Sequence, residues 1–219
     1  PPHCPQTEVV LLWSWPAFSL DQSNATLFWG TGGPRCPGED LGLGDLDGPI
    51  IAGHEPCGIV AEVGEGVDPA LAKIGDRVMD HHYSGCGVCK HCRGGWSQLC
   101  LDGITVYGAT GHGAHAKYMK VPAHTLVKLP DDLSFKTGAA ISCGTGTAYG
   151  ALKRLDLAGD ETIVIFGQGP VGLSGTQLAK EMGARVIALD VSEERRQLAL
   201  DFGADEVIAR DCTWLFPSR

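Results

Sequence analysis

The amino-acid sequence predicts an α/β plus β fold class, with a domain of short strands followed by part of a parallel, helix-covered sheet. From Ile50 to Lys128, short β-rich runs are separated by Gly and Pro, as in a barrel or sandwich of short strands. From Thr162 to Ile208, strand and helix patterns alternate, which predicts a βαβαβ unit. A chain of 219 residues with 43% hydrophobic content fits one large domain or two small ones with a core.

The first part shows four candidate strands, in the runs CGIVAEV, DRVMDH, AKYMKV and HTLVKL. The first 35 residues are rich in Pro and Trp and have no clean period, so we predict no element there. Their apolar run, Val9 to Phe18, is too short to span a bilayer and lacks the preceding positive charges of a signal peptide. We therefore expect no membrane role and a cytoplasmic location.

The second part begins with a helical pattern over residues 135–155, which several Gly residues weaken. The runs TIVIF and RVIAL lack alternation, so we expect strands that helices cover on both faces. The period of the sequence changes near residues 143–150, and we place the domain boundary there.

Charge and cysteine content narrow the class of protein. The net charge is −9, and residues 1–80 hold 3 Lys and Arg against 12 Asp and Glu, which is unlike a basic nucleic-acid face. Nine cysteines are many, but five of them are scattered singly along a chain of globular size. This pattern favours a reducing compartment over a disulfide scaffold.

The segment GCGVCKHCRGGWSQLC contains four cysteines, Cys86, Cys89, Cys92 and Cys100. Gaps of two residues, with Gly at the turns, let a chain direct its sulfurs inward around one tetrahedral Zn²⁺. Four thiolates leave no open position, so the predicted zinc is structural and stabilises the loop. A redox thiol cluster is the alternative.

The segment FGQGPVG places Gly167, Gly169 and Gly172 in G-x-G-x-x-G spacing between a predicted strand and a predicted helix. These glycines permit a tight turn, the approach of a pyrophosphate and close helix packing. Asp190 ends the next strand. A carboxylate there would accept hydrogen bonds from both ribose hydroxyls of NAD and repel the 2′-phosphate of NADP. Arg195 is a further candidate for the ribose or phosphate, and a glycine-rich turn without ligand is the alternative.

A second candidate metal site is dispersed along the chain. His54 and Glu55 lie in AGHEPCG, and Cys143 lies in ISCGTGTAYG near the domain boundary. Each residue alone suits an ordinary buried or hydrogen-bonded role. Together, on either side of a boundary where ligand clefts form, they suggest an open catalytic zinc.

These motifs, with GHEPCGIVAEVGEGV and GDRV, resemble the zinc-containing medium-chain alcohol dehydrogenases over roughly residues 50–208. The resemblance implies a GroES-like β-barrel catalytic domain with a structural zinc lobe over 1–145, of which 1–35 are atypical. It also implies a partial Rossmann NAD-binding domain over 146–219. The implied reaction is hydride transfer between a primary or secondary alcohol, or a polyol, and NAD, with an aldehyde or ketone as product.

The resemblance also implies site residues. The four cysteines of the lobe match the structural zinc ligands, His54 and Cys143 match two ligands of the catalytic zinc, and Glu55 matches an acid that can enter its coordination sphere. Thr147 matches a threonine that touches the nicotinamide. The coenzyme site would comprise Thr147, Gly167, Gly169, Pro170, Val171, Gly172, Asp190 and Arg195.

Two features depart from the family pattern. The first catalytic ligand of the family comes from a Cys-Gly-Ser/Thr-Asp motif, and the nearest candidate here, Cys36, has Gly38 where the hydroxyl should be. We interpret the remaining histidines that could substitute as ordinary surface or strand residues: His81, His82, His112, His115 and His124. The chain also stops after the third Rossmann strand, so we expect an incomplete chain that would form a homo-oligomer if it were complete.

Three functions are alternatives to an NAD-dependent zinc alcohol dehydrogenase. A catalytically silent protein would keep the structural zinc and only weak nucleotide binding. A zinc-independent quinone reductase conflicts with His54, Glu55 and Cys143. A nucleic-acid-binding zinc ribbon would need a basic face and more widely separated cysteine pairs.

Overall fold

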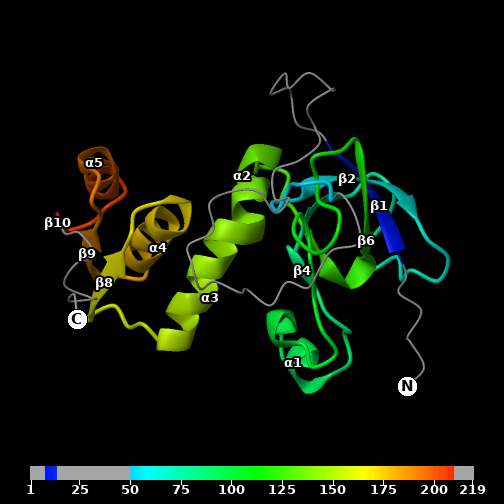
Figure 1. Cartoon of the computed structure of the whole chain (residues 1–219), viewed down its shortest axis with the longest axis horizontal. Coiled ribbons are helices and arrows are strands. Elements are labelled where there is room, and N and C mark those ends of the chain that lie inside the picture. The colour runs from blue at the N-terminus through cyan, green and yellow to red at the C-terminus, as the bar shows by residue number, and fades with distance from the viewer. Residues whose placement is uncertain (1–7, 14–49, 210–219) are drawn as a thin grey trace. The chain divides into compact units, whose positions relative to one another are not determined.

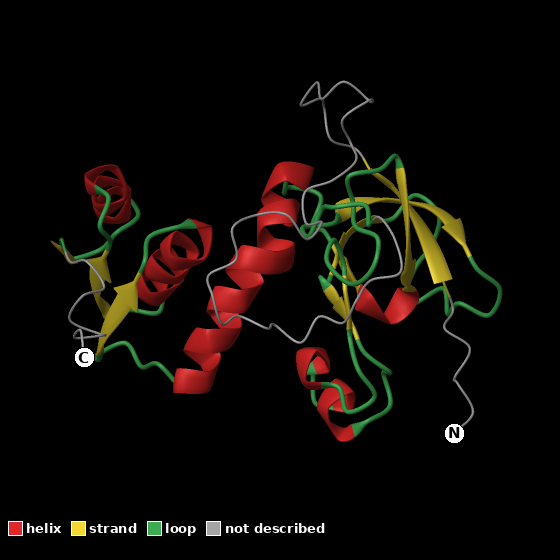
Figure 2. Cartoon of the chain, viewed as in Figure 1, coloured by secondary structure: helices red, strands yellow, loops and turns green. Residues whose placement is uncertain are grey.

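A computed structural model describes the backbone of residues 8–13 and 50–209 (Figures 1 and 2). The chain divides into two compact units between Cys143 and Gly144. The sequence prediction placed this boundary two residues later, after residue 145. None of the helices that the structure describes is long and apolar enough to cross a membrane.

The first unit contains a five-stranded sheet in the order β6-β1-β2-β3-β7, in which every neighbouring pair is antiparallel. Four of its strands overlap the four predicted runs. The strands are β1 (Glu8–Trp13), β2 (Cys57–Val63), β3 (Arg77–Asp80), β6 (Tyr118–Pro122) and β7 (Leu126–Lys128).

The strand β1 lies where the sequence indicated no element. It pairs with β2 on one side and with β6 on the other, with an irregularity in the β2 ladder between Val10 and Leu11. The run EVVLLW lacks the period-2 alternation that signals a half-buried strand, which is why sequence patterns missed it.

The core of the first unit consists mostly of Val and Ala side chains packed against the sheet. The buried members of the main cluster are Val60, Val67, Ala72, Val78, Tyr107, Ala114, Met119, Val121 and Ala123. A second cluster lies beneath helix α2 (Phe135–Ala140) and includes Cys57, Met79 and Leu129. Gly138 permits this packing, because a Cβ there would lie 2.6 Å from the Cys57 sulfur.

The cysteine-rich segment forms a lobe of short elements rather than part of the main sheet. The lobe comprises the two-stranded sheet β4 (Tyr83–Ser84) and β5 (Thr105–Val106), the single turn α1 (Lys90–Arg93) and the 3₁₀ turn η2 (Ser97–Leu99). A further 3₁₀ turn, η3 (Ala123–Thr125), joins β6 to β7.

The helical segment predicted over 135–155 is interrupted by a wider turn. Helix α2, which Ser134 caps by accepting a hydrogen bond from the Thr137 N–H, leads into the π-helix η4 (Ile141–Thr145), and α3 (Gly146–Leu155) follows. Single π turns are rare and often lie at functional sites. Cys143 lies in the middle of this one.

The second unit has a three-stranded parallel sheet in the order β10-β9-β8, as the alternating pattern predicts. The chain runs through β8 (Thr162–Phe166), α4 (Pro170–Glu181), β9 (Arg185–Leu189), α5 (Glu193–Asp201) and β10 (Glu206–Ile208). The buried core is almost entirely Ala and Val, with Leu152 from α3, and Ile163 and Ile165 of β8 pack against it. These small residues let the helices lie close to the sheet.

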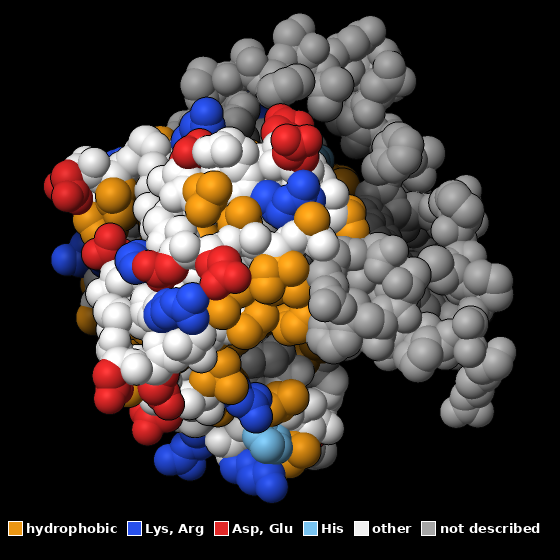
Figure 3. Space-filling model, turned by 90° about the vertical axis from the view of Figure 1, so that its left-hand side faces the viewer, with side chains coloured by type: hydrophobic (Ala, Val, Ile, Leu, Met, Phe, Trp, Pro, Cys, Tyr) orange, Lys and Arg blue, Asp and Glu red, His pale blue; other side chains and the backbone are white. Residues whose placement is uncertain are grey.

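The expectation that β8 is covered on both faces is wrong for the described residues. Exposure alternates along this strand, and Val164 and Phe166 are 44% and 55% exposed. The described helices cover only the face that carries Ile163 and Ile165. In the view that faces the second unit, hydrophobic side chains lie exposed among both acidic and basic ones (Figure 3).

Candidate metal centres and nucleotide site

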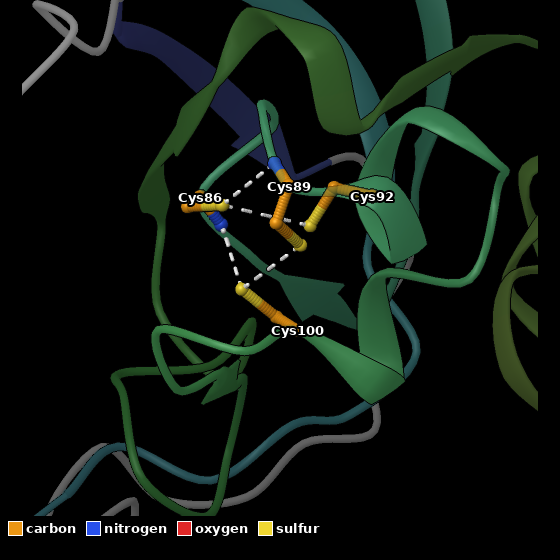
Figure 4. Close-up of side chains that lie close together, drawn as sticks. All are labelled: Cys86, Cys89, Cys92 and Cys100. Atoms are coloured by element: carbon orange, nitrogen blue, oxygen red, sulfur yellow. Dashed lines mark hydrogen bonds between the residues drawn. The ribbon is translucent and has the colours of Figure 1, made fainter.

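The four cysteines of the lobe converge on one point (Figure 4). The sulfurs of Cys86, Cys89, Cys92 and Cys100 all lie within 4.8 Å of one another. The Cys86–Cys92 and Cys89–Cys100 sulfur pairs are each 4.0 Å apart. Zn–S bonds of about 2.3 Å in a tetrahedron require sulfurs about 3.8 Å apart. The lobe therefore has the dimensions of a four-thiolate zinc site.

The backbone of the lobe is also suited to thiolates. The N–H groups of Cys86 and Cys89 donate to the sulfurs of Cys100 and Cys86, each at 3.3 Å. Gly85 leaves room for the cluster, because a Cβ there would lie 2.7 Å from the Cys92 sulfur. Hydrogen bonds of this kind stabilise the charged form of a thiol.

The pKa values of the thiols differ strongly within the lobe. Backbone N–H groups, first that of Cys92 and then that of Leu101, lower the pKa of Cys89 to about 6. Burial raises the pKa of Cys92 to about 12. A metal ion would have to displace the protons of the less acidic thiols, so its affinity would fall as the pH falls.

A second cluster brings together His54, His82 and Cys143. One ligand atom of each lies within 4.8 Å of the others. The rings of the two histidines meet edge to face, with centroids 4.6 Å apart. Among the residues that the structure describes, these two groups of His, Cys, Asp and Glu side chains have metal-ligand spacing.

His54 is placed by backbone segments that approach each other closely. Gly53 has φ +109°, and a Cβ on it would lie 2.7 Å from the Ala114 nitrogen. A Cβ on Gly113 would lie 2.2 Å from the Gly53 carbonyl oxygen, which accepts a hydrogen bond from the Ala114 N–H. Only glycines fit at these two positions, which explains the glycine that precedes His54 and the glycine at 113 that lies against it.

His82 is placed by the pairing of β2 with β3. Cys57 lies opposite Met79, and Gly58 opposite Val78. Extending this antiparallel register beyond the ladder sets position 54 opposite position 82. The backbone N–H of Asp80 also donates to the Pro56 carbonyl, which fixes the chain on either side of the two histidines.

Both imidazoles are oriented by backbone carbonyls. The Nδ1 of His54 lies 2.7 Å from the Tyr107 carbonyl oxygen, and the Nδ1 of His82 lies 2.7 Å from that of Ser142. A carbonyl oxygen only accepts, so each Nδ1 carries the proton, and each Nε2 has a lone pair for a metal. Ser142 precedes Cys143, so the same contact ties His82 to the π-helix that carries the third ligand.

The protonation states suit a metal site. Burial lowers the pKa of His82 to about 4, although the hydrogen bond to Ser142 opposes this shift. The imidazole is therefore neutral at pH 7, as a ligand must be. Burial, and then the charge of Glu55, raise the pKa of Cys143, so a metal ion would have to displace its proton.

Three protein ligands of this kind fit a four-coordinate zinc ion with one open position, which is the pattern of catalytic zinc sites. Glu55, predicted as a further ligand, is exposed and does not belong to the cluster. Its charge nevertheless acts on the Cys143 thiol. Cys36, the sequence candidate for the missing ligand, lies outside the described residues.

The interpretation of His82 as an ordinary histidine needs correction, because it is 3% exposed and faces two candidate ligands. The loop between β2 and β3 is long, so the register that sets His54 opposite His82 could not be deduced from the sequence. Of the other histidines, His81 lies beside His82 with ring centroids 4.9 Å apart. His112, His115 and His124 are exposed.

The glycine-rich turn has the local geometry that its motif predicts. Gly167 has φ +81°, and a Cβ on Gly172 would lie 1.8 Å from the Gly167 carbonyl oxygen. By contrast, a Cβ on Gly169 would meet nothing within 4 Å, so the space beside it is open. Gly169 is the N-cap of α4, and Pro170 begins the helix. The turn thus presents a helix N-terminus without a side chain in front of it.

Asp190 lies at the end of β9, close to this turn. Its Oδ2 accepts a hydrogen bond of 2.6 Å from the Gln168 N–H, and its Oδ1 accepts one of 2.8 Å from the Ser192 N–H. Burial alone would raise the pKa of Asp190, but these N–H groups and the charge of Arg195 lower it. Asp190 is therefore ionised at neutral pH.

The other predicted coenzyme residues also lie in the second unit. Arg195 is exposed, and its Nη1 lies 3.8 Å from Asp190 Oδ2. Val171 follows Pro170 in the first turn of α4, and both are exposed. Thr147 is exposed on α3.

Comparison with known proteins reveals two family matches. Residues 36–131 match the alcohol dehydrogenase GroES-like domain, and residues 170–215 match the zinc-binding dehydrogenase family. The chain is 43% identical over 156 residues to YphC of Escherichia coli, named as an uncharacterized zinc-type alcohol dehydrogenase-like protein, covering 70% of this chain and 44% of YphC. It is 40% identical over 161 residues to an alcohol dehydrogenase of Geobacillus stearothermophilus. This match covers 73% of this chain and 47% of that protein.

A solved structure agrees with these matches. The acetophenone reductase of Geotrichum candidum, determined in complex with NAD, superposes with a TM-score of 0.69 at 36% identity. The match covers 78% of this chain and 50% of that one. The chain thus spans about half the length of its relatives. The predicted combination of a GroES-like domain with part of a dehydrogenase coenzyme domain is confirmed.

Proposed function

This chain belongs to the zinc-containing medium-chain alcohol dehydrogenase family. We propose that it catalyses the NAD-dependent oxidation of alcohols and binds zinc at two sites. The single observation that carries this proposal is the cluster of His54, His82 and Cys143, which offers three ligands and leaves a fourth position open. An open position is what distinguishes a catalytic zinc from a structural one.

In this proposal the four thiolates of Cys86, Cys89, Cys92 and Cys100 hold the structural zinc, and His54, His82 and Cys143 hold the catalytic one. A bound zinc ion would supply Lewis acidity, which makes an alcohol hydroxyl easier to deprotonate and its carbon a better hydride donor. The Tyr107 and Ser142 carbonyls keep both imidazoles in the tautomer that binds metal. Glu55 remains a proposed exchangeable ligand.

The second unit would hold the coenzyme. The turn at Gly167, Gly169 and Gly172 would bind the pyrophosphate. Asp190 would accept hydrogen bonds from the hydroxyls of the adenosine ribose. Each Asp190 oxygen accepts one N–H in the structure and retains a second lone pair for a ribose hydroxyl. Thr147 is the proposed contact to the nicotinamide. Bound NAD would supply the hydride acceptor for the oxidation of a primary or secondary alcohol or a polyol.

The proposal is tested by following NADH formation with a panel of primary alcohols, secondary alcohols and polyols on purified protein of known zinc content. We expect NAD to support turnover and NADP to support much less, because the Asp190 carboxylate repels a 2′-phosphate. The alternative, a catalytically silent protein, predicts a single zinc per chain and no NADH with any alcohol. That result would overturn the proposed function.

A further inference from the structure

Gln168 occupies the variable position between the first two glycines of the turn, and its side chain is completely buried, with 0% exposure. A buried carboxamide needs partners for both of its polar ends. Its Nε2 donates to the Ile165 carbonyl at 3.1 Å, and its Oε1 accepts from the Thr176 hydroxyl at 2.9 Å. Thr176 is itself 0% exposed. These contacts tie the turn to strand β8 and to helix α4.

The backbone of the same residue holds Asp190. The Gln168 N–H donates to Asp190 Oδ2 at 2.6 Å, while the N–H of the preceding Gly167 donates to the Leu189 carbonyl at 2.7 Å. The two adjacent N–H groups of the turn are therefore both hydrogen-bonded to residues at the end of β9. The Gln168 N–H thus fixes one oxygen of the carboxylate, while the Ser192 N–H holds the other.

The Gln168 side chain points into the protein and cannot itself reach a bound coenzyme. We propose that Gln168 and Thr176 form a buried clamp that positions the Asp190 carboxylate for the adenosine ribose of NAD. This inference rests on the proposed function. It extends that function by naming two positioning residues that make no contact with the coenzyme. A hydrophobic residue at position 168 could fill the same space, but it would not fix the N–H.

The clamp makes a prediction that a merely structural contact would not. The Asp190 carboxylate favours NADH through the ribose hydroxyls and disfavours NADPH through repulsion of the 2′-phosphate. A carboxylate that is no longer held should bind NADH less well and exclude NADPH less well. A general loosening of the fold would instead weaken both coenzymes equally.

The test measures the dissociation constants of NADH and NADPH by fluorescence titration of the full chain. Thr176→Val removes the hydroxyl with almost no change in shape and leaves the buried Gln168 Oε1 without its donor. We expect about tenfold weaker NADH binding and a smaller preference for NADH over NADPH. Thr176→Ser keeps the hydroxyl and should restore both quantities to about wild-type values.

Ser174→Ala is the matched control. It removes a hydroxyl on the same helix whose partner is Thr145 rather than the turn, at 3.1 Å. Both coenzyme affinities should be unchanged in it. A double-mutant cycle of Thr176→Val with Asp190→Asn should be strongly non-additive, because the clamp acts through the carboxylate.

The outcomes separate the inference from the proposed function. If the wild-type protein binds neither coenzyme, the proposed function fails and the clamp has no role in it. If the wild type binds NADH but Thr176→Val leaves the NADH:NADPH ratio unchanged, or the cycle is additive, the clamp alone is overturned. The loss in Thr176→Val, its rescue by Ser and a non-additive cycle would together establish it.

Discussion

The two candidate metal centres lie in the same unit but are built in opposite ways. All four ligands of the lobe come from one stretch, residues 86–100, and each short turn of that stretch positions the next sulfur. The ligands of the second cluster lie at positions 54, 82 and 143, and only the β2–β3 register and the π-helix bring them together. We therefore expect the lobe to depend on its metal for order, whereas the sheet and the π-helix place the residues of the second cluster.

The two centres also differ in charge. Four thiolates around Zn²⁺ give a formal charge of −2 and a closed coordination shell. One thiolate and two neutral imidazoles give +1 and leave a position open. A positive, open centre would attract a substrate oxygen, and a negative, closed one would not. The same ion is thus expected to stabilise the fold at one centre and to take part in chemistry at the other.

The largest expected difference is in stability. Cys89→Ser should abolish zinc binding by the lobe and lower the melting temperature by roughly 10 °C, because the lobe has little apolar core of its own. Cys143→Ser should lower it by less than about 3 °C, because the sheet and the π-helix place that site without a metal. Scanning calorimetry of both variants makes the comparison. Equal losses would contradict the assignment of one centre as structural and the other as catalytic.

The difference in construction explains what could be predicted from the sequence. The four cysteines and the glycine-rich turn are local patterns, and their residues do lie together in the structure. His82 was missed because its neighbours in space are distant in sequence. Both strands were predicted, but the register that sets His82 opposite His54 was not. Strand β1 was missed because its pattern lacks a clear period.

A smaller difference should appear in metal exchange. A moderate chelator such as dipicolinate should remove one zinc within minutes from the open centre, while the closed four-thiolate centre keeps its ion. The melting temperature should fall by less than about 3 °C during this step. A colorimetric zinc indicator follows the release, and Cys143→Ser should lack the fast phase. Release of both ions in one phase would show that the two centres are not distinct.

The smallest expected effect concerns the buried carboxylate of Asp80, at the end of β3. It is 0% exposed, its Oδ1 is hydrogen-bonded to the Thr125 hydroxyl, and its Oδ2 has no partner among the described residues. Burial raises the pKa of Asp80 well above the ordinary value. Its stabilising contribution is therefore full below pH of about 3.9, the unfolded value, and is lost as the pH rises toward the folded pKa.

Asp80→Asn keeps the shape and is neutral at every pH, so it should remove this dependence. Between pH 5 and pH 8 the melting temperature of the variant should fall by roughly 3 °C less than that of the wild type. Lys128→Gln, which breaks an exposed ion pair with Asp76, is the matched control and should follow the wild-type pH curve in this range. Parallel curves for Asp80→Asn and wild type would mean that Asp80 is ionised in the folded protein.

The most direct measurement is the zinc content per chain of the wild type and of His82→Ala, by elemental analysis after the protein has been freed of loosely bound metal. The account predicts two zinc ions in the wild type and one in His82→Ala. Two ions in both proteins would show that His82 is not a ligand. One ion in both would leave only the four-cysteine lobe as a metal site and would contradict the central claim.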